Sequence, residues 1–127
     1  MKVSEASFLT KGTFYQRLEQ RTNNEFTTVT GFVLDMGVTV DNTWFCRVTE
    51  IRNTYSDYWA ASDATWGPDV EINFLQSTPE SIEGVLNQAL TAATKQRKNA
   101  TDAVDLAERN LARIVVMHEL SAGTVAL

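Results

Sequence analysis

The residues that could carry nucleophilic or acid–base chemistry are few. The chain of 127 residues contains one histidine, His118, and one cysteine, Cys46. A nucleophilic thiol needs a base within reach, and His118 is the only imidazole that could serve. His118 stands near the end of a helical pattern and Cys46 within a strand pattern, so we interpret both as structural residues. One cysteine and one histidine do not make a conventional zinc site, and we expect neither a metal nor a cofactor.

A carboxylate site could involve Asp57, Asp63 and Asp69, which are evenly spaced along one segment. Their spacing does not match an EF-hand loop, which needs ligands on alternate residues and a central glycine. The chain also lacks a P-loop, a Rossmann glycine pattern and a Gly-x-Ser-x-Gly elbow. A carboxylate hydrolase or transferase is therefore only a third hypothesis, and we expect that the protein is not an enzyme.

Aromatic and cationic residues offer a binding site instead. Tyr58, Trp59 and Trp66 crowd a segment that we interpret as a loop over residues 56–69, and such side chains give large contact areas. Arg109 and Arg113 are four residues apart, so on a helix they share a face and could hold a phosphate. Together they predict a pocket for a nucleotide-like ligand between sheet and helix. In the alternative interpretation the aromatics close one end of the sheet and the arginines pair with nearby acids.

The clearest strand pattern covers residues 26–40, where alternate residues form one mainly apolar face. That face consists of Phe26, Thr28, Thr30, Phe32, Leu34, Met36, Val38 and Val40. Gly31 and Gly37, on the other face, indicate bulges or a close backbone approach. Residues 70–75 are typical of another short strand. Residues 5–22 suit either a strand or a short helix, and we favour the helix.

A hairpin should follow the first long strand. Asp41 and Asn42 both tolerate positive φ, which predicts a two-residue turn and a return strand from 44 to 55. This register places Val38 opposite Phe45, and apolar residues of both strands then share one side of the sheet.

The chain ends in a helical region over residues 78–121. Thr78 is a good N-cap ahead of Pro79, and Gly123 follows the last apolar residue. An apolar seam with spacings of three and four comprises Ile82, Leu86, Ala89, Ala93, Ala100, Val104, Ala107, Leu111 and Ile114. The charges run from acid to base twice, which suits two helices in series or one long helix with a polar waist. One long helix would exceed the diameter of a compact domain of this length, so we favour a hairpin broken near Asn99.

These patterns predict an α+β fold: a small antiparallel sheet of three to five strands within residues 13–75, packed against the C-terminal helix or helical hairpin. We expect one domain over residues 1–127, with a sheet-rich part (1–76), a helical part (77–122) and a short tail (123–127). The second half of the helical region is apolar on more than one side, which favours self-association as a dimer or larger assembly.

The expected function is that of a non-enzymatic, homo-oligomeric interaction protein. Its small size suits an inhibitor, adaptor or particle component of a virus or mobile element. The alternative is the nucleotide-like ligand binder, so the partners would be a second copy, another protein or a phosphate-bearing small molecule. The net charge of −5 argues against nucleic acid as a partner. Without a signal-peptide or membrane-spanning pattern, we expect a cytoplasmic protein, or one in the host cytoplasm or virion if viral.

Overall fold

The computed structural model describes residues 1–55 and 58–124. The chain divides into two compact units, Met1–Ala92 and Ala93–Leu127. The first unit holds all the strands and the beginning of the helix α1 (Pro79–Thr124), and the second unit holds the rest of that helix. The fold is α+β, as predicted.

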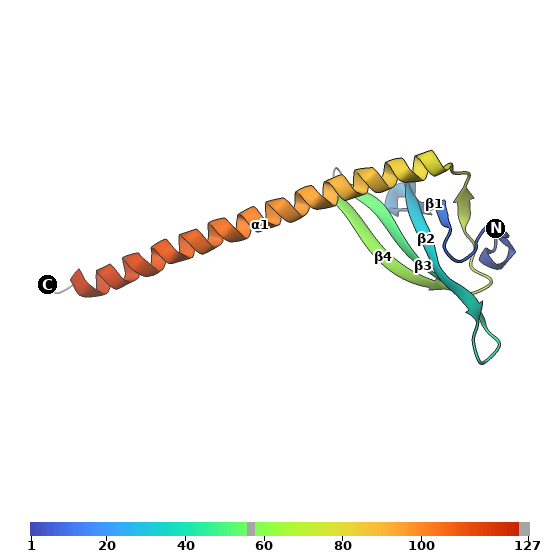
Figure 1. Cartoon of the computed structure of the whole chain (residues 1–127), viewed down its shortest axis with the longest axis horizontal. Coiled ribbons are helices and arrows are strands. Elements are labelled where there is room, and N and C mark those ends of the chain that lie inside the picture. Colours follow the sequence, from blue (N-terminus) through green and yellow to red (C-terminus); the bar gives the residue numbers. More distant parts are fainter. Residues whose placement is uncertain (56–57, 125–127) are drawn as a thin grey trace. The chain divides into compact units, whose positions relative to one another are not determined.

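Five strands form one antiparallel sheet in the order β4-β3-β2-β1-β5 (Figure 1). The strands are β1 (Phe14–Gln20), β2 (Phe26–Val38), β3 (Trp44–Tyr55), β4 (Tyr58–Trp66) and β5 (Asn73–Leu75). Two short 3₁₀ turns, η1 (Val3–Glu5) and η2 (Thr22–Asn24), precede β1 and β2. β2 and β3 are the two longest strands and lie inside the sheet, so their side chains contribute to both of its faces.

Two segments differ from the sequence-based expectation. Residues 14–20 form a strand rather than the favoured helix, because β1 pairs with β2 on one side and with β5 on the other. The expected loop over residues 56–69 is mostly the strand β4, which pairs with β3. Alanines at 60, 61 and 64 give this segment low strand propensity, so its structure is decided by pairing with the preceding strand β3 rather than by its own residues.

The hairpin between β2 and β3 has a three-residue loop instead of the expected two-residue turn. Thr39 N–H donates to the Thr43 carbonyl at 2.9 Å, and Asn42 adopts the left-handed conformation with φ of 62°. Val38 therefore pairs with Trp44 rather than with Phe45. A bulge between Val33 and Asp35 shifts the register again, so the predicted pairing is wrong along the whole hairpin.

The main core lies on the sheet face that the alternation pattern of residues 26–40 did not favour. Val29 and Val33 of β2 are fully buried, whereas Phe26 on the predicted apolar face is 57% exposed. The residues of this core are Val3, Ala6, Leu9, Tyr15, Val33, Cys46, Val48, Trp66 and Ile72. The segment before β1 covers this face, since Val3, Ala6 and Leu9 belong to the core and Val3 N–H donates to the Val70 carbonyl at 2.9 Å.

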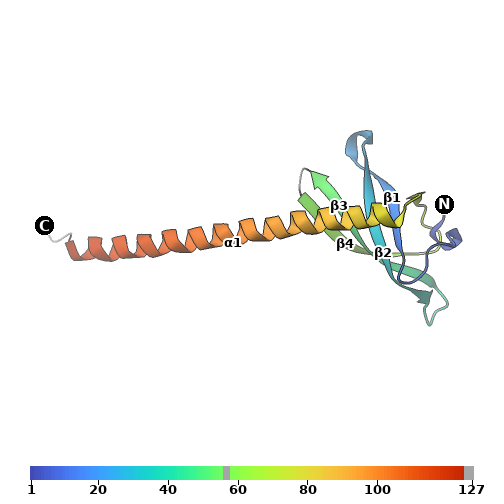
Figure 2. The same cartoon turned by 45° about the horizontal axis from the view of Figure 1, so that its top comes forward.

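The first turns of α1 cross the other face of the sheet (Figure 2). Thr78 caps the helix, because its Oγ1 accepts a hydrogen bond from Ser81 N–H at 3.2 Å, as predicted. Ser81 Oγ in turn donates to Gln16 Oε1 of β1 at 3.1 Å, and Ala92 is buried. Ser81 thus joins the cap of the helix to the sheet.

The helix continues through Asn99 to Thr124, so the hairpin that we favoured is wrong. No glycine or proline occurs between residues 85 and 122 to stop it. Just beyond the expected break, Thr101 donates its hydroxyl to the Arg97 carbonyl at 3.0 Å within the same helix. Within the part of the chain that the structure describes, no helix combines the length and apolar content needed to cross a membrane.

Candidate functional site

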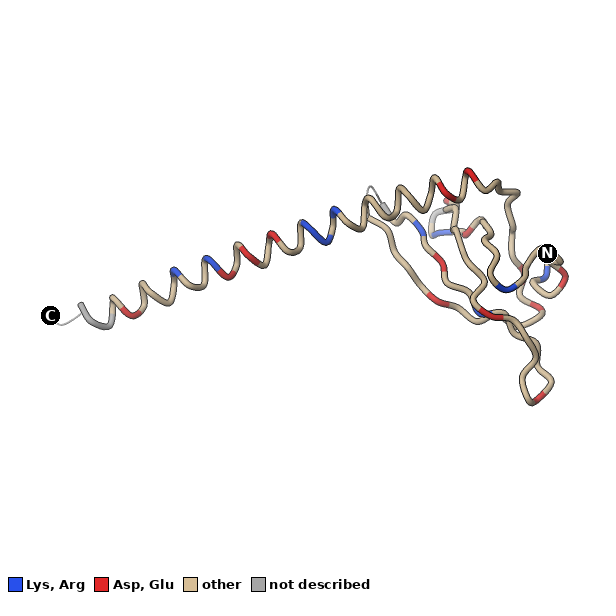
Figure 3. The backbone as a smooth tube through the Cα atoms, viewed as in Figure 1, with Lys and Arg blue, Asp and Glu red and all other residues tan. Residues whose placement is uncertain are grey.

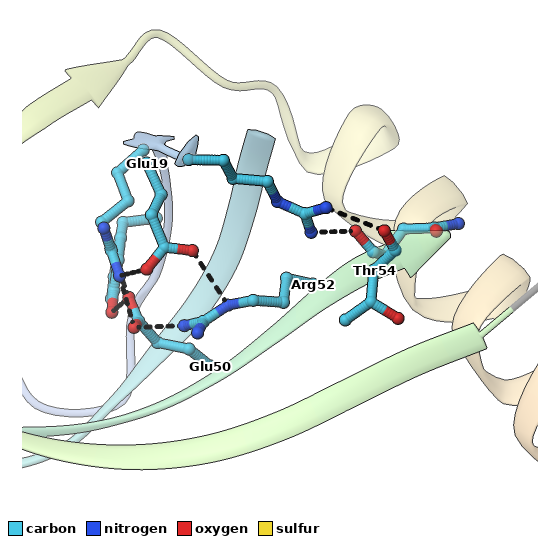
Figure 4. Close-up of polar contacts among 8 residues, drawn as sticks. Glu19, Glu50, Arg52 and Thr54 are labelled. Atoms are coloured by element: carbon cyan, nitrogen blue, oxygen red, sulfur yellow. Dashed lines mark hydrogen bonds and ion pairs between the residues drawn. The ribbon is translucent and has the colours of Figure 1, made fainter. Parts of the chain in front are cut away.

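The most elaborate polar arrangement in the sheet unit is a group of five side chains on the core face of the sheet. We call it the Glu50 cluster, and it consists of Tyr15, Arg17, Glu19, Glu50 and Arg52. Figure 4 shows Glu19 of β1 and Glu50 and Arg52 of β3 pointing toward one another. The cluster forms because alternate residues of a strand share a face, and β1 and β3 flank the central strand β2.

Glu50 is the centre of the cluster and is only 3% exposed. Arg17 binds it bidentately, with Nε–Oε2 at 2.7 Å and Nη2–Oε1 at 2.8 Å. Tyr15 Oη donates to Oε2 at 2.6 Å, and Arg52 Nη2 donates to Oε1 at 3.2 Å. Both carboxylate oxygens therefore accept two hydrogen bonds each, which compensates for the burial of the charge.

Glu19 completes the charge balance from the rim of the cluster. Its Oε2 lies 3.3 Å from Arg52 Nε, and its Oε1 lies 3.6 Å from Arg17 Nη2. The buried Arg52 Nε–H has no aligned hydrogen-bond acceptor, so its contact with Glu19 is an ion pair without a hydrogen bond. Two arginines thus face two glutamates, and the cluster has no net charge to attract an ionic ligand.

The contacts within the cluster shift the pKa values of Glu50 and Tyr15 in opposite directions. Burial alone would raise the pKa of Glu50, but the hydrogen bonds from Arg17 and Tyr15 outweigh it and hold this pKa below its ordinary value. Burial, followed by the hydrogen bond to Glu50, raises the pKa of Tyr15 far above its usual range. Folding therefore favours the ionised form of Glu50 and the protonated form of Tyr15, the two forms that their mutual hydrogen bond requires.

The Tyr15 ring explains the glycine opposite it. Tyr15 pairs with Gly31 of β2, and a Cβ atom at residue 31 would overlap the tyrosine ring. Gly31 therefore marks a close approach, one of the two roles expected for it, and this approach lets the Tyr15 hydroxyl reach Glu50. The centre of the Trp66 ring lies 5.6 Å from the centre of the Tyr15 ring and 5.9 Å from the Arg17 guanidinium carbon. The tryptophan ring therefore covers the cluster on the side of the apolar core.

The predicted aromatic residues are not gathered at one point. Tyr58 and Trp66 stand at opposite ends of β4. Trp66 is buried in the core, and Trp59 lies on the opposite face of the strand because it is an odd number of residues away. Tyr58 is half exposed. A single stacking surface from these three residues is therefore not present in the sheet unit.

The predicted arginine pair belongs to the other unit. Arg109 and Arg113 are both exposed on α1 between Ala93 and Thr124. Arg109 Nε–H donates to the Asp105 carbonyl of its own helix at 3.5 Å, a long hydrogen bond. The three aromatic residues therefore belong to the sheet unit and the two arginines to the helical unit. The pocket for a nucleotide-like ligand that would combine them stays a prediction.

The remaining candidates for chemistry lie apart from one another. Cys46 is completely buried in the sheet unit, and burial raises the pKa of its thiol, so it is a core residue without nucleophilic character. His118 lies in the helical unit. Among the described residues, no group of three or more histidine, cysteine, aspartate or glutamate side chains is placed to hold a metal ion. Asp57 lies outside the described residues.

An open cavity of ≈ 570 Å³ lies beside the β1–β5 pair. Its lining is mainly aromatic, with Phe8, Phe14 and Phe74 as the largest members. Phe8 and Phe74 meet edge to face with their ring centres 5.0 Å apart. Among the described residues that line it there is no carboxylate, imidazole or thiol side chain, and Thr13, Gln76 and Ser77 add polar groups to the aromatic ones.

The helical unit exposes many large apolar side chains. From residue 97 to residue 121 every side chain is exposed, including the large apolar ones. We call these the apolar helix surface: Val104, Leu106, Leu111, Ile114, Val115, Val116, Met117 and Leu120, which are 47–68% exposed. Such a surface can bind another protein chain, but it holds no group arranged for catalysis.

No protein family, curated protein or solved structure matches the chain. Sequence reasoning missed the Glu50 cluster, although a signal existed. Arg17, Glu50 and Arg52 are charged residues inside strand segments, at positions that alternate with apolar ones. We had no reason to place them on the buried face, because charged residues in strands usually face solvent.

Proposed function

We propose that this protein is a non-enzymatic interaction protein that self-associates through the apolar seam of the helical unit, the side of the apolar helix surface that carries Val104, Leu111 and Ile114. The observation that carries the proposal is the exposure of eight large apolar side chains along one stretch of helix, with Leu111 and Ile114 both 61% exposed. In monomeric soluble proteins, large exposed apolar patches are uncommon and mark interaction sites. Water would have to solvate this surface in a solitary chain.

The helix itself supports the same proposal. Most helical stability in proteins comes from packing of an apolar face against something else, and helices without such packing are marginal in water. Here the described residues after Ala92 pack against no other element of their own unit, because that unit is helix alone. A partner chain would supply the packing that the unit lacks.

A second copy of the chain is the partner that the seam favours. The seam residues recur at alternating spacings of three and four, the pattern by which helices pack side by side with their own kind. Every copy carries the same seam, so association needs no other component. An inhibitor, an adaptor or a particle component would each use the sheet unit for its specific contacts and the helix for assembly.

The test compares two variants that place the same charge on different sides of the helix. Ile114→Glu puts a carboxylate in the seam, whereas Val116→Glu is two residues further along and therefore roughly 200° around the helix. Both side chains are β-branched and exposed, at 61% and 53%. Sedimentation equilibrium of the full chain would give the association constant of each.

We expect the unmodified protein to be a dimer or larger, and Ile114→Glu to weaken its association by roughly tenfold or more, because burying an unpaired charge is costly. Val116→Glu should retain most of the association. A monomeric unmodified protein at high concentration would contradict the proposal. Equal effects of the two substitutions would show that the seam is not the contact surface.

A further inference from the structure

One stripe of the helical unit alternates small and large residues. Its members follow each other at spacings of four and three: Ala93, Arg97, Ala100, Val104, Ala107, Leu111 and Ile114. We call this the heptad stripe. Its three alanines recur every seven residues, and a larger residue stands between each pair of them. Because packed helices fill space closely, each alanine leaves room that a larger residue of a partner helix should occupy.

We propose that two copies of the helix pair antiparallel, in a register centred at the level of Asp102. This inference rests on the self-association proposed above and specifies its geometry. In this register Ala93 lies opposite Leu111 of the second copy. Arg97 lies opposite Ala107, and Ala100 lies opposite Val104. The twofold symmetry of the dimer repeats each of these layers, so every alanine in them meets a larger residue.

A parallel pair in register would pack the same stripe poorly. Layers at residues 93, 100 and 107 would then contain two alanines each, while the layer at Leu111 would contain two leucines. The uneven widths would leave voids beside the alanine layers, and voids of this kind reduce stability. Size complementarity along the stripe therefore favours the antiparallel pair.

The charges favour the same orientation. A basic block, Lys95 to Lys98, precedes an acidic block that ends at Glu108 along the helix (Figure 3). The antiparallel register brings Arg97 and Lys98 of each copy level with Asp105 and Glu108 of the other. A parallel pair would instead place Arg97 against Arg97 within the contact, and the repulsion of like charges disfavours that arrangement.

Cysteine cross-linking distinguishes the two orientations. Residues 93 and 111 are 18 positions apart, so they are separated by about 27 Å along one helix. Ala93→Cys and Leu111→Cys chains, one of them carrying a tag that changes its size, would be mixed and treated with a short thiol-specific cross-linker. The native Cys46 is 0% exposed in the sheet unit, so it does not compete.

We expect the mixture to give a product that contains one tagged and one untagged chain, and each variant alone to give little product. Strong cross-linking of Ala93→Cys alone and of Leu111→Cys alone, with little mixed product, would overturn the antiparallel register while leaving self-association intact. Sedimentation of the same samples separates this outcome from failure of the proposed function, in which the chains would be monomeric and no product would form.

Thr101→Cys provides a second test that leaves the heptad stripe unchanged. Thr101 borders the stripe next to the proposed centre, so an antiparallel pair brings the two copies of residue 101 to the same side of the contact. A parallel pair would place them on opposite sides. Self-cross-linking of Thr101→Cys is therefore the expected result, and its absence in a dimeric sample would count against the register.

Discussion

The two units of the chain differ in the kind of side chain that they bury and the kind that they expose. The sheet unit buries the charge of Glu50, which is 3% exposed, and surrounds it with hydrogen-bond partners from Arg17 and Tyr15. The helical unit exposes its large apolar residues, with Met117 at 68%, and provides no cover for them. Burying a charge and exposing large apolar side chains both raise the free energy of the protein unless other interactions offset them. In the sheet unit the compensation is inside the unit, and for the helical unit we propose that another chain supplies it.

This contrast separates stability from assembly. A buried ion pair with complete hydrogen bonding holds a fold in one arrangement without exposing anything for a partner. An exposed apolar seam contributes nothing to its own unit until another chain covers it. We therefore expect substitutions in the sheet unit to change the free energy of unfolding, and substitutions in the helical unit to change the association constant.

The strongest test of the sheet unit removes the centre of the Glu50 cluster. Glu50→Ala would remove the buried carboxylate that Arg17 and Arg52 share and leave them only their ion pairs with Glu19, and we expect a loss of about 3 kcal/mol in the free energy of unfolding. Urea unfolding followed by tryptophan fluorescence would measure it. Glu71→Ala is the matched control, because Glu71 is an exposed partner of the N-terminal amine, and its effect should stay below about 1 kcal/mol. Similar losses in both variants would contradict the role of the cluster.

A smaller effect is expected from adding one methyl group beneath Tyr15. Gly31→Ala would force the Tyr15 ring away from Glu50, at a cost of about 1–3 kcal/mol for overpacking. Gly37→Ala is the control on the same strand, because its new methyl would meet only the Phe45 ring at 3.4 Å. Thermal unfolding of the two variants should separate them clearly. A Gly31→Ala variant as stable as the control would show that the close approach is not required.

The dependence of stability on pH tests the cluster without changing its shape. The pKa of Glu50 is lowered by folding, so its contribution is present above the unfolded value of 4.5 and is lost as pH falls through the folded value. The pKa of Tyr15 is raised, so its contribution is present below the unfolded value of 10.0 and is lost as pH rises above that value. Urea midpoints should therefore decline on both sides of this range. Glu50→Gln should flatten the acid side, and an unchanged acid limb in that variant would exclude Glu50 as its source.

Features determined by neighbouring residues were predictable from the sequence. Thr78 and Pro79 mark the helix start by themselves, and the alternation over residues 26–40 indicates a strand without reference to its partners. Features that depend on distant segments were not. The strand β1 pairs with β5 near the end of the sheet unit, and the Glu50 cluster joins Arg17 to a carboxylate 33 residues away.

The expected break near Asn99 failed for a different reason. We compared the helix length with the diameter of one compact domain, which assumes that every turn of the helix packs against the sheet. The helix instead belongs to two units, and only the first part shares a unit with the sheet. The absence of glycine and proline from residues 85–122 was the better guide, because backbone propensity is a local property.

The most direct test of the central claim is to follow both units during dilution of the full chain. All three tryptophans lie in the sheet unit, so their fluorescence reports that unit, while circular dichroism at the helix minimum reports mainly α1. Over about a thousandfold dilution, mass action should dissociate the assembly. We predict that helical signal falls while tryptophan fluorescence stays constant. A helical signal that is independent of concentration, in a chain that sediments as a monomer, would contradict the claim that a second copy stabilises the helix.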